Sequence, residues 1–266
     1  MKRAAIITGG TADMSFAIAV FLLSFFRENP NIDVDVVIFQ NGISEKDRKV
    51  LEAIHPCIFK EYRSPFDMDV LRKIGTMHRF TPFVFCKYEC LKLLEEYRTV
   101  VWFDYDMVVT GNLEELFVPV KGGNRLMLTR TLGECIRKDV VESDLIKYEA
   151  KVGVHSSVMA FYDNLPDYIK MYNWCIEMTK RYAGSLKLPE QVIFSLLIHK
   201  FHLPVYPLPF QLYSPHPVLH RGNPWDIYVK IWHSYGRKKF WNGIQFDIWN
   251  KYYSDYLKIC EQEGSR

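Results

Sequence analysis

Short apolar runs alternate with segments of helical composition along most of the chain, and this alternation constrains the fold more than any other feature. The periodicity predicts strands at residues 4–8, 34–40, 100–103, 125–129 and 158–162, and helices at 15–28, 44–54, 81–97, 167–182 and 190–200. Strands that alternate with helices predict an α/β fold with a mostly parallel central sheet. Such sheets bind ligands at the carboxyl ends of their strands.

Two of the predicted helices carry start signals of their own. Ser44 can cap the helix that follows it, with Asp47 three residues further on, as in a variant of the capping box. Pro82 stands in the first turn of the helix at 81–97, where the missing N–H leaves no hydrogen bond unmade. Both signals favour helices in these windows.

The one shift in composition lies after residue 203, where prolines cluster and four of the six tryptophans follow. No internal repeat or low-complexity linker interrupts the chain. We therefore predict a single domain over residues 1–266, with a core at 1–203 and a C-terminal extension at 204–266. An aromatic stripe with helical spacing in the extension is expected to pack on the domain. It comprises Phe246, Trp249, Tyr253 and Tyr256.

Composition excludes several classes of protein. A hydrophobic fraction of 48% excludes a mainly disordered chain. The net charge is only +3, and basic and acidic residues are interleaved, so nucleic acid is not an expected partner. The six cysteines form no CxxC pair and are expected to be reduced thiols in a cytoplasmic protein. The longest mostly apolar stretch, 16–26, is shorter than the roughly 20 residues of a membrane-spanning helix.

The most informative segment places Asp104 and Asp106 directly after the apolar run at 100–103. Side chains two residues apart in an extended backbone point the same way, so both carboxylates could meet one divalent cation. The alternative is a solvent-exposed turn at the end of a strand, because Asp-x-Asp is common by chance. Spacing alone leaves both interpretations open.

A second motif lies near the C-terminus, where His233, Gly236, Lys239 and Trp241 stand at fixed offsets. Together with the two aspartates, it resembles the retaining glycosyltransferases of family eight, in which an Asp-x-Asp follows a strand and a His-x-x-Gly-x-x-Lys-Pro-Trp comes late. Phe240 replaces the proline. The order of the elements and the segments 42–44 and 111–113 extend the resemblance over most of the chain. It implies a GT-A-like fold that binds a nucleotide-sugar.

The resemblance implies that Asp104, Asp106 and His233 hold Mn²⁺, with Mg²⁺ as the alternative, and that this metal bridges the diphosphate of a UDP-sugar. Two carboxylates and an imidazole suit Mn²⁺ better than they suit Mg²⁺ or Ca²⁺. A metal on the diphosphate stabilises the charge of the leaving UDP. Lys239 would add a positive charge to the same phosphates, unless it is one member of a solvated run at 237–239.

Further contacts to the nucleotide are implied for Thr8, Gly9, Asp13, Lys87, Tyr105 and Gly236. The loop at residues 8–13 is not a GxGxxG fingerprint and supports no dinucleotide. Asp13 could equally cap the helix that follows it. Lys87 stands where the family commonly has arginine, so it keeps the charge but lacks the planar fork.

Glu190 and Gln191 match the family's acidic-Gln pair. The resemblance implies that Gln191 stabilises the transferred sugar beneath its anomeric carbon, while Glu190 orients Gln191 or holds sugar hydroxyls. The alternative for Glu190 is a favourable charge in the first turn of a helix. The family's Asn-x-Gly appears here as His155-Ser156-Ser157, so contacts to sugar and acceptor are expected to differ.

The predicted function is transfer of galactose or glucose from a UDP-sugar to an oligosaccharide or glycolipid acceptor, with retention, in synthesis of a bacterial surface glycan such as lipopolysaccharide. One alternative is a nucleotidyltransferase, which would release pyrophosphate. Another is a non-catalytic module that binds sugar-nucleotides or glycans on the same fold. Residues 225–260 could also contact the inner face of the cytoplasmic membrane, since aromatic and basic side chains suit the headgroup layer.

Overall fold

A computed structural model of the chain describes residues 2–78, 80–118, 126–130, 153–220, 222 and 226–264. The chain divides into two compact units. Unit 1 comprises Met1–Arg3, Tyr62–Trp102 and Leu116–Leu208, and unit 2 comprises Ala4–Glu61, Phe103–Glu115 and Pro209–Arg266. The fold is mixed α/β with a mostly parallel central sheet, as predicted. Among the described helices, none combines the length with the apolar composition that a membrane-spanning segment requires.

Unit 2 contains a parallel sheet in the order β3-β2-β1. The strands are β1 (Lys2–Thr11, whose first two residues belong to unit 1), β2 (Asp35–Asn41) and β3 (Cys57–Glu61). Ile6 lies opposite Val36, and Val36 lies opposite Cys57. Both Ile6 and Val36 are buried, as expected for parallel strands that helices cover.

Two helices of unit 2 follow the predicted pattern closely. Helix α1 spans Ser15–Glu28, the predicted bounds. Helix α2 spans Glu45–Ile54 and begins after the cap residue Ser44, whose Oγ accepts a hydrogen bond from the backbone N–H of Asp47 at 3.1 Å. The predicted cap is therefore confirmed.

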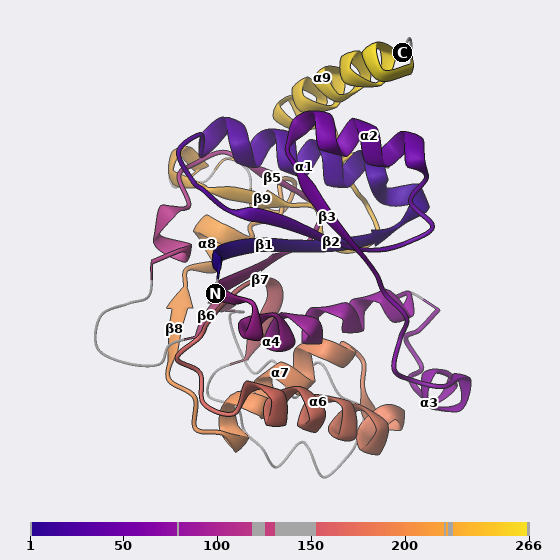
Figure 1. The fold of residues 1–266 in the computed structure, drawn as a ribbon, viewed down its shortest axis with the longest axis vertical. Helices are drawn as coiled ribbons and strands as arrows, with labels where there is room; N and C mark the ends of the chain where they lie inside the picture. The colour runs from indigo at the N-terminus through magenta and orange to yellow at the C-terminus, as the bar shows by residue number, and fades with distance from the viewer. Residues whose placement is uncertain are drawn as a thin grey trace. The chain divides into compact units, whose positions relative to one another are not determined.

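The C-terminal part of unit 2 contains α8 (Phe210–Tyr213), a 3₁₀ turn at Asp226–Tyr228, β9 (Ile231–His233) and α9 (Asp247–Gly264). Strand β9 pairs in antiparallel fashion with β5 (Met107–Val109). Helix α9 packs against α1 and α2 (Figure 1). The extension thus completes the helical layer of unit 2.

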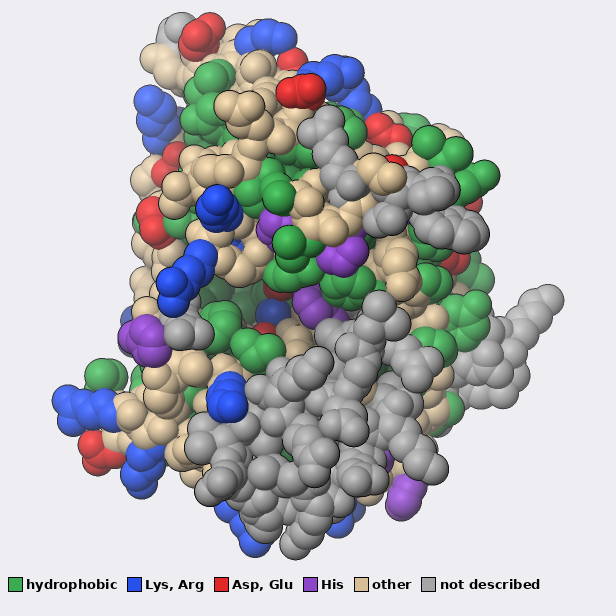
Figure 2. Space-filling model, turned by 180° about the vertical axis from the view of Figure 1, so that it is seen from behind, with side chains coloured by type: hydrophobic (Ala, Val, Ile, Leu, Met, Phe, Trp, Pro, Cys, Tyr) green, Lys and Arg blue, Asp and Glu red, His purple; other side chains and the backbone are tan. Residues whose placement is uncertain are grey.

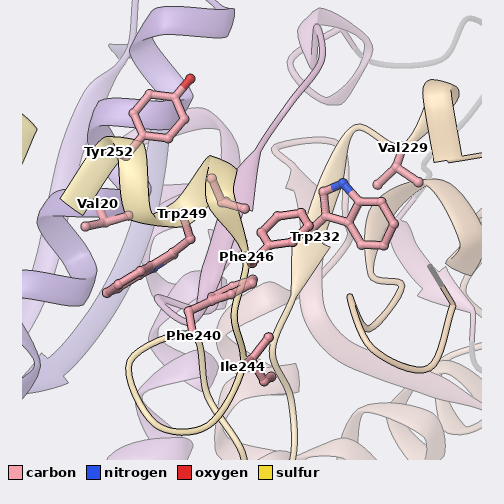
Figure 3. Packing of buried hydrophobic residues seen from close by; sticks show 9 residues of the cluster. Val20, Val229, Trp232, Phe240, Ile244, Phe246, Trp249 and Tyr252 are labelled. Atoms are coloured by element: carbon pink, nitrogen blue, oxygen red, sulfur yellow. The ribbon is translucent and has the colours of Figure 1, made fainter. Parts of the chain in front are cut away.

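An aromatic cluster fixes this extension to α1 and β5 (Figure 3). Its centre contains Trp232, Phe240, Phe246 and Trp249, each no more than 5% exposed. Phe240 and Trp249 stack with ring centroids 6.0 Å apart. The predicted aromatic stripe packs on the protein, because Phe246 and Trp249 are buried in the cluster and the remaining two residues lie against it. Those two are Tyr253 and Tyr256.

Unit 1 contains strands in the order β4-β7-β6-β8. They are β4 (Tyr97–Phe103, whose last residue belongs to unit 2), β6 (Leu126–Arg130), β7 (Val154–Tyr162) and β8 (Val205–Leu208). Strand β6 runs antiparallel to β7 and parallel to β8. The helices are α3 (Met68–Lys73), α4 (Glu89–Lys92), α6 (Tyr168–Tyr182) and α7 (Pro189–Lys200). Helix α6 packs against α4 and α7.

The predicted continuous helix at residues 81–97 is wrong. The segment forms a 3₁₀ helix at Pro82–Tyr88, the single α-helical turn α4, and a further 3₁₀ turn at Leu93–Glu95, and strand β4 already begins at Tyr97. Four consecutive residues, 85–88, are buried, which no one-sided surface helix allows. Contacts on every side, and not helix propensity, therefore determine the backbone conformation of this segment, which is mostly the tighter 3₁₀ helix.

Charged side chains are mixed rather than massed on the face that Figure 2 shows. Basic, acidic and histidine side chains are scattered there among apolar and neutral ones, and the described residues form no large basic block on this face. The five described cysteines, 57, 86, 90, 175 and 260, are free thiols, while Cys135 lies outside the described residues. Residues 125 and 225 of the sequence predictions also lie outside them.

Candidate active site

The antiparallel pair β5 and β9 brings the two sequence motifs of unit 2 together. Met107 lies opposite His233, and the backbone N–H of Ser234 donates to the carbonyl oxygen of Asp106 at 2.9 Å. Asp104 and Asp106 lie in the short bend between β4 and β5. A strand ladder between segments more than a hundred residues apart thus sets His233 beside both carboxylates.

Ser24 of α1 and Asn29, the residue after α1, hold β5 and the segment that follows it. Ser24 Oγ accepts a hydrogen bond from the backbone N–H of Val109 at 2.9 Å. Asn29 Oδ1 accepts one from the backbone N–H of Leu113 at 2.7 Å. Ser24 and Asn29 are both buried, so these bonds lie out of competition with water. The strand that follows Asp106 is therefore rigidly supported.

Asp104, Asp106 and His233 form a cluster that can hold a metal ion. The His233 Nε2 atom lies 3.1 Å from Asp106 Oδ1 and 3.8 Å from Asp104 Oδ2. One ligand atom from each residue lies within 4.8 Å of the others, and no second such group occurs among the described residues. Asp106 and His233 are buried, while Asp104 is partly exposed. Two carboxylate oxygens and one imidazole nitrogen fit a divalent transition metal.

Lys239 is bound to this cluster through its side chain. Its Nζ donates to Asp106 Oδ2, so both oxygens of the Asp106 carboxylate have partners. Burial alone would raise the pKa of Asp106, but the charges and hydrogen bonds of His233 and Lys239 outweigh it and hold that pKa well below its usual range. Lys239 is half-buried, whereas Arg237 and Lys238 are exposed. Lys239 is therefore not simply one member of a solvated run.

Two of the predicted nucleotide contacts lie in strand β1. Thr8 is 1% exposed, and its Oγ1 has no hydrogen-bond partner in the described part of the chain. A buried hydroxyl without a partner is costly, so it marks a place where a ligand or water can bond. Gly9 is buried and lies opposite Phe39 of β2.

The other predicted nucleotide contacts of unit 2 are more exposed. Asp13 lies on the surface, accepts a hydrogen bond from Thr11 Oγ1 at 2.5 Å, and does not cap α1, whose N-cap is Met14. Tyr105 stacks on Trp241 with ring centroids 6.3 Å apart. Gly236 has a φ of +87°, a backbone conformation that favours glycine, which explains its place in the motif.

Unit 1 holds a second polar cluster, which contains Lys87, Glu190 and Gln191. Lys87 Nζ donates to Glu190 Oε1 at 3.1 Å and to Ser156 Oγ at 3.2 Å. Ser156 Oγ donates to Glu190 Oε1 at 2.8 Å, and the Ser156 backbone N–H lies 3.4 Å from Gln191 Oε1. All four residues are buried, and Lys87 also lies 5.6 Å from the ring centroid of Trp102. Glu190 does lie in the first turn of α7, but it also pairs with a buried lysine.

Ser156 stands out in the sequence only as part of a departure from the family pattern and is not among the predicted site residues. The structure makes it the link between Lys87 and the pair Glu190 and Gln191. A weak signal exists, because Ser156 is a hydroxyl residue inside a strand whose later residues, 158–162, are all buried and mostly apolar.

Replacing Lys87 by Met is expected to lower the free energy of unfolding by about 3–5 kcal/mol, because it leaves the Glu190 carboxylate buried without its cation. The double variant Lys87→Met with Glu190→Gln is expected to recover much of this loss. Denaturant unfolding of both proteins measures the difference. An unchanged unfolding free energy in Lys87→Met would contradict the ion pair.

Comparison with known proteins identifies the fold and the family. A sequence model described as glycosyl transferase family 8 matches residues 5–245. The chain belongs to this family. A glycosyltransferase role follows, and GT-A glycosyltransferases use a divalent metal and a nucleotide-sugar, which agrees with the Asp104, Asp106 and His233 cluster. A search of curated protein sequences finds no match.

Solved structures of family 8 and related glycosyltransferases have the same fold. Galactosyltransferase LgtC, crystallised with donor and acceptor sugar analogues, matches with a TM-score of 0.70 at 14% identity over 97% of this chain and 95% of that one. The apo form of the glycosyltransferase GlyE of Streptococcus pneumoniae TIGR4 matches with a TM-score of 0.66 at 18% identity over 100% of this chain and 64% of that one. Mouse xyloside xylosyltransferase 1 matches with a TM-score of 0.54 at 14% identity over 87% of this chain and 97% of that one. These likenesses confirm the GT-A fold class.

Proposed function

We propose that this family 8 protein is a retaining, Mn²⁺-dependent hexosyltransferase that moves galactose or glucose from UDP to a carbohydrate acceptor. The observation that carries the proposal is the convergence of Asp104, Asp106 and His233, which come from two motifs far apart in the sequence. The alternative of an isolated Asp-x-Asp in a solvated turn does not account for the buried His233 beside it.

Under this proposal the residues of unit 2 hold the nucleotide. Asp104, Asp106 and His233 would bind Mn²⁺, or Mg²⁺ in its place, and the metal would neutralise charge on the diphosphate as UDP leaves. Lys239 would move from Asp106 to a phosphate oxygen, where its ammonium group acts as a point charge. Thr8, Gly9, Asp13, Tyr105 and Gly236 are proposed to surround the rest of the nucleotide.

The polar cluster of unit 1 is proposed to act on the sugar. The Gln191 carbonyl oxygen would stabilise positive charge at the anomeric carbon, and Glu190 would hold sugar hydroxyls or orient Gln191. Lys87 pairs with the buried Glu190 carboxyl group at 3.1 Å and would offer a donor to a phosphate or hydroxyl. Retention then follows if the acceptor attacks from the face that UDP leaves.

Incubation with UDP-galactose or UDP-glucose, Mn²⁺ and oligosaccharide or glycolipid acceptors tests this function. Release of UDP together with a glycosylated acceptor is the expected result. Pyrophosphate as product would favour a nucleotidyltransferase. Tight binding of the UDP-sugar, without formation of a product with any of the acceptors, would favour a non-catalytic binding module.

Replacing Lys239 by Met is expected to strengthen binding of Mn²⁺ to the nucleotide-free protein, because the lysine no longer competes for Asp106. The same change is expected to weaken UDP binding in saturating Mn²⁺ by about tenfold or more, since a hydrogen bond to a charged group contributes roughly 1.5–3 kcal/mol. Isothermal titration calorimetry measures both affinities. Lys238→Met is the matched control, because Lys238 is exposed, and equal effects in the two variants would contradict the role of Lys239.

We further propose that the protein works in the cytoplasm on a bacterial surface glycan such as lipopolysaccharide, at the inner face of the membrane. Trp232, Phe246 and Trp249 are buried, so membrane contact cannot rest on their insertion. Ile227 and Tyr228 of the same segment are 81% and 59% exposed and are the better candidates. Sedimentation with anionic vesicles should capture the wild-type protein more than Ile227→Ser, and equal capture of both would contradict this surface.

A further inference from the structure

Ser214 contacts the predicted metal ligand His233 from the side opposite the two carboxylates. It follows α8, is 0% exposed, and its Oγ lies 2.9 Å from His233 Nδ1. The other ring nitrogen, Nε2, faces Asp106 and Asp104 at 3.1 and 3.8 Å. The imidazole is therefore held at both nitrogens, with the hydroxyl on one side and the candidate metal site on the other.

Backbone hydrogen bonds fix this hydroxyl against β9. The Ser214 N–H donates to the carbonyl oxygen of Phe210 at 2.9 Å, which closes the α8 turn. The His233 N–H donates to the carbonyl oxygen of Pro215 at 3.0 Å, and the Lys230 N–H donates to that of Leu212 at 2.8 Å. Leu212 and Pro215 flank Ser214, and they bond the residue that precedes β9 and the last residue of β9, respectively. The distance from Ser214 Oγ to His233 therefore depends on well-anchored backbone.

The chemistry of a hydroxyl suits this position. A histidine that binds a metal through Nε2 carries its proton on Nδ1 and needs an acceptor there. Without a metal, an Nε2–H can donate to Asp106, and Nδ1 then needs a donor. A serine hydroxyl supplies either role by rotating, whereas a carbonyl or carboxylate oxygen could only accept.

We propose that Ser214 is a positioning residue for the metal site, which orients the His233 ring so that Nε2 points at the ion with its lone pair free. This inference rests on the proposed function and adds to it a residue that neither sequence motif contains. Residues that support a metal ligand in this way typically contribute 10–100-fold to metal affinity or activity.

Metal affinity tests the inference without any turnover. Electron paramagnetic resonance counts free Mn²⁺ during titration of the full-length protein, and we expect Ser214→Ala to bind Mn²⁺ about 10–100-fold more weakly than wild type. Thr179→Val is the matched control, because Thr179 is also 0% exposed but belongs to unit 1, and its hydroxyl bonds the carbonyl oxygen of Cys175 and the hydroxyl of Tyr88. It should lose stability and keep its Mn²⁺ affinity.

A second readout separates this inference from the proposed function. Nitrogen-15 NMR of the metal-free protein reports the tautomer and hydrogen bonding of His233, and Ser214→Ala should shift its Nδ1 resonance while Thr179→Val should not. Wild-type Mn²⁺ affinity in Ser214→Ala, or an unmoved Nδ1 resonance, would overturn the role of Ser214. Absence of Mn²⁺ binding in the wild-type protein would overturn the metal site itself, and with it this inference, whatever the NMR shows.

Discussion

Replacing Asp106 by Asn will weaken Mn²⁺-dependent UDP binding by more than about 100-fold. A loss of about 100-fold is the largest that is typical for residues that only support a metal ligand. The loss for a direct ligand should be larger. Asp106 is buried, and its two oxygens face His233 and Lys239. In the part of the chain that the structure describes, Asp104 is the one other carboxylate of the cluster. Asp104→Asn is expected to cause a loss of the same kind.

The choice of Asn matters because Asp106 also belongs to a buried charge network. Alanine would leave His233 and Lys239 without their shared partner and would destabilise the protein together with the site. Asn keeps the shape and one acceptor oxygen, so circular dichroism should show the wild-type fold, and the melting temperature should fall less than in the alanine variant because only the charge is lost. Asp255→Asn on α9 is the control, since the described partners of Asp255 are the exposed residues Arg27 and Lys258. Mn²⁺-dependent UDP affinity of wild-type strength in Asp106→Asn would contradict the assignment.

Replacing Gln191 by Ala is the second change with a large expected effect. We expect kcat to fall by about 10²–10³, the range found when a group that stabilises transition-state charge is removed. The affinity for UDP should change little, because the contact with the sugar is made mainly in the transition state. Rapid-quench kinetics and calorimetry with UDP measure the two quantities separately.

Gln191 accepts a hydrogen bond from the backbone of Ser156, so its removal frees a buried N–H and could disturb β7. Gln191→Glu keeps that acceptor and provides a second variant with less structural change. Gln262→Ala, on the exposed surface of α9, controls for the loss of an amide in general. Equal losses in UDP affinity and in kcat would indicate a nucleotide-site or folding role for Gln191 instead.

Local patterns predicted most of the elements that position the site. The bounds of α1 and the Ser44 cap follow from periodicity and capping chemistry, which act within a few residues. The strand before Asp104 also follows from a local pattern, the apolar run at residues 100–103. The prediction of a helix at 81–97 is wrong because Lys87 and its neighbours are buried on all sides. Their burial depends on packing partners from elsewhere in unit 1, which a local pattern does not contain.

The candidate site depended more on long-range order than on local pattern. His233 was predicted as a site residue only from the family resemblance. Its position beside the carboxylates results from the pairing of β5 with β9, and these strands of three residues each are too short to show periodicity. Ser214 has no sequence signal of its own, and Ser156 has only the weak signal of a hydroxyl residue inside a buried strand. Their hydroxyls matter only because the fold sets them beside Glu190 and His233.

Metal-dependent transfer is the central claim, and UDP release in the presence of a chelator tests it most directly. The purified protein should release UDP from a UDP-hexose and acceptor in Mn²⁺. The rate should fall to background in excess EDTA and should return when Mn²⁺ is restored above the chelator concentration. Full activity in excess EDTA would contradict the account.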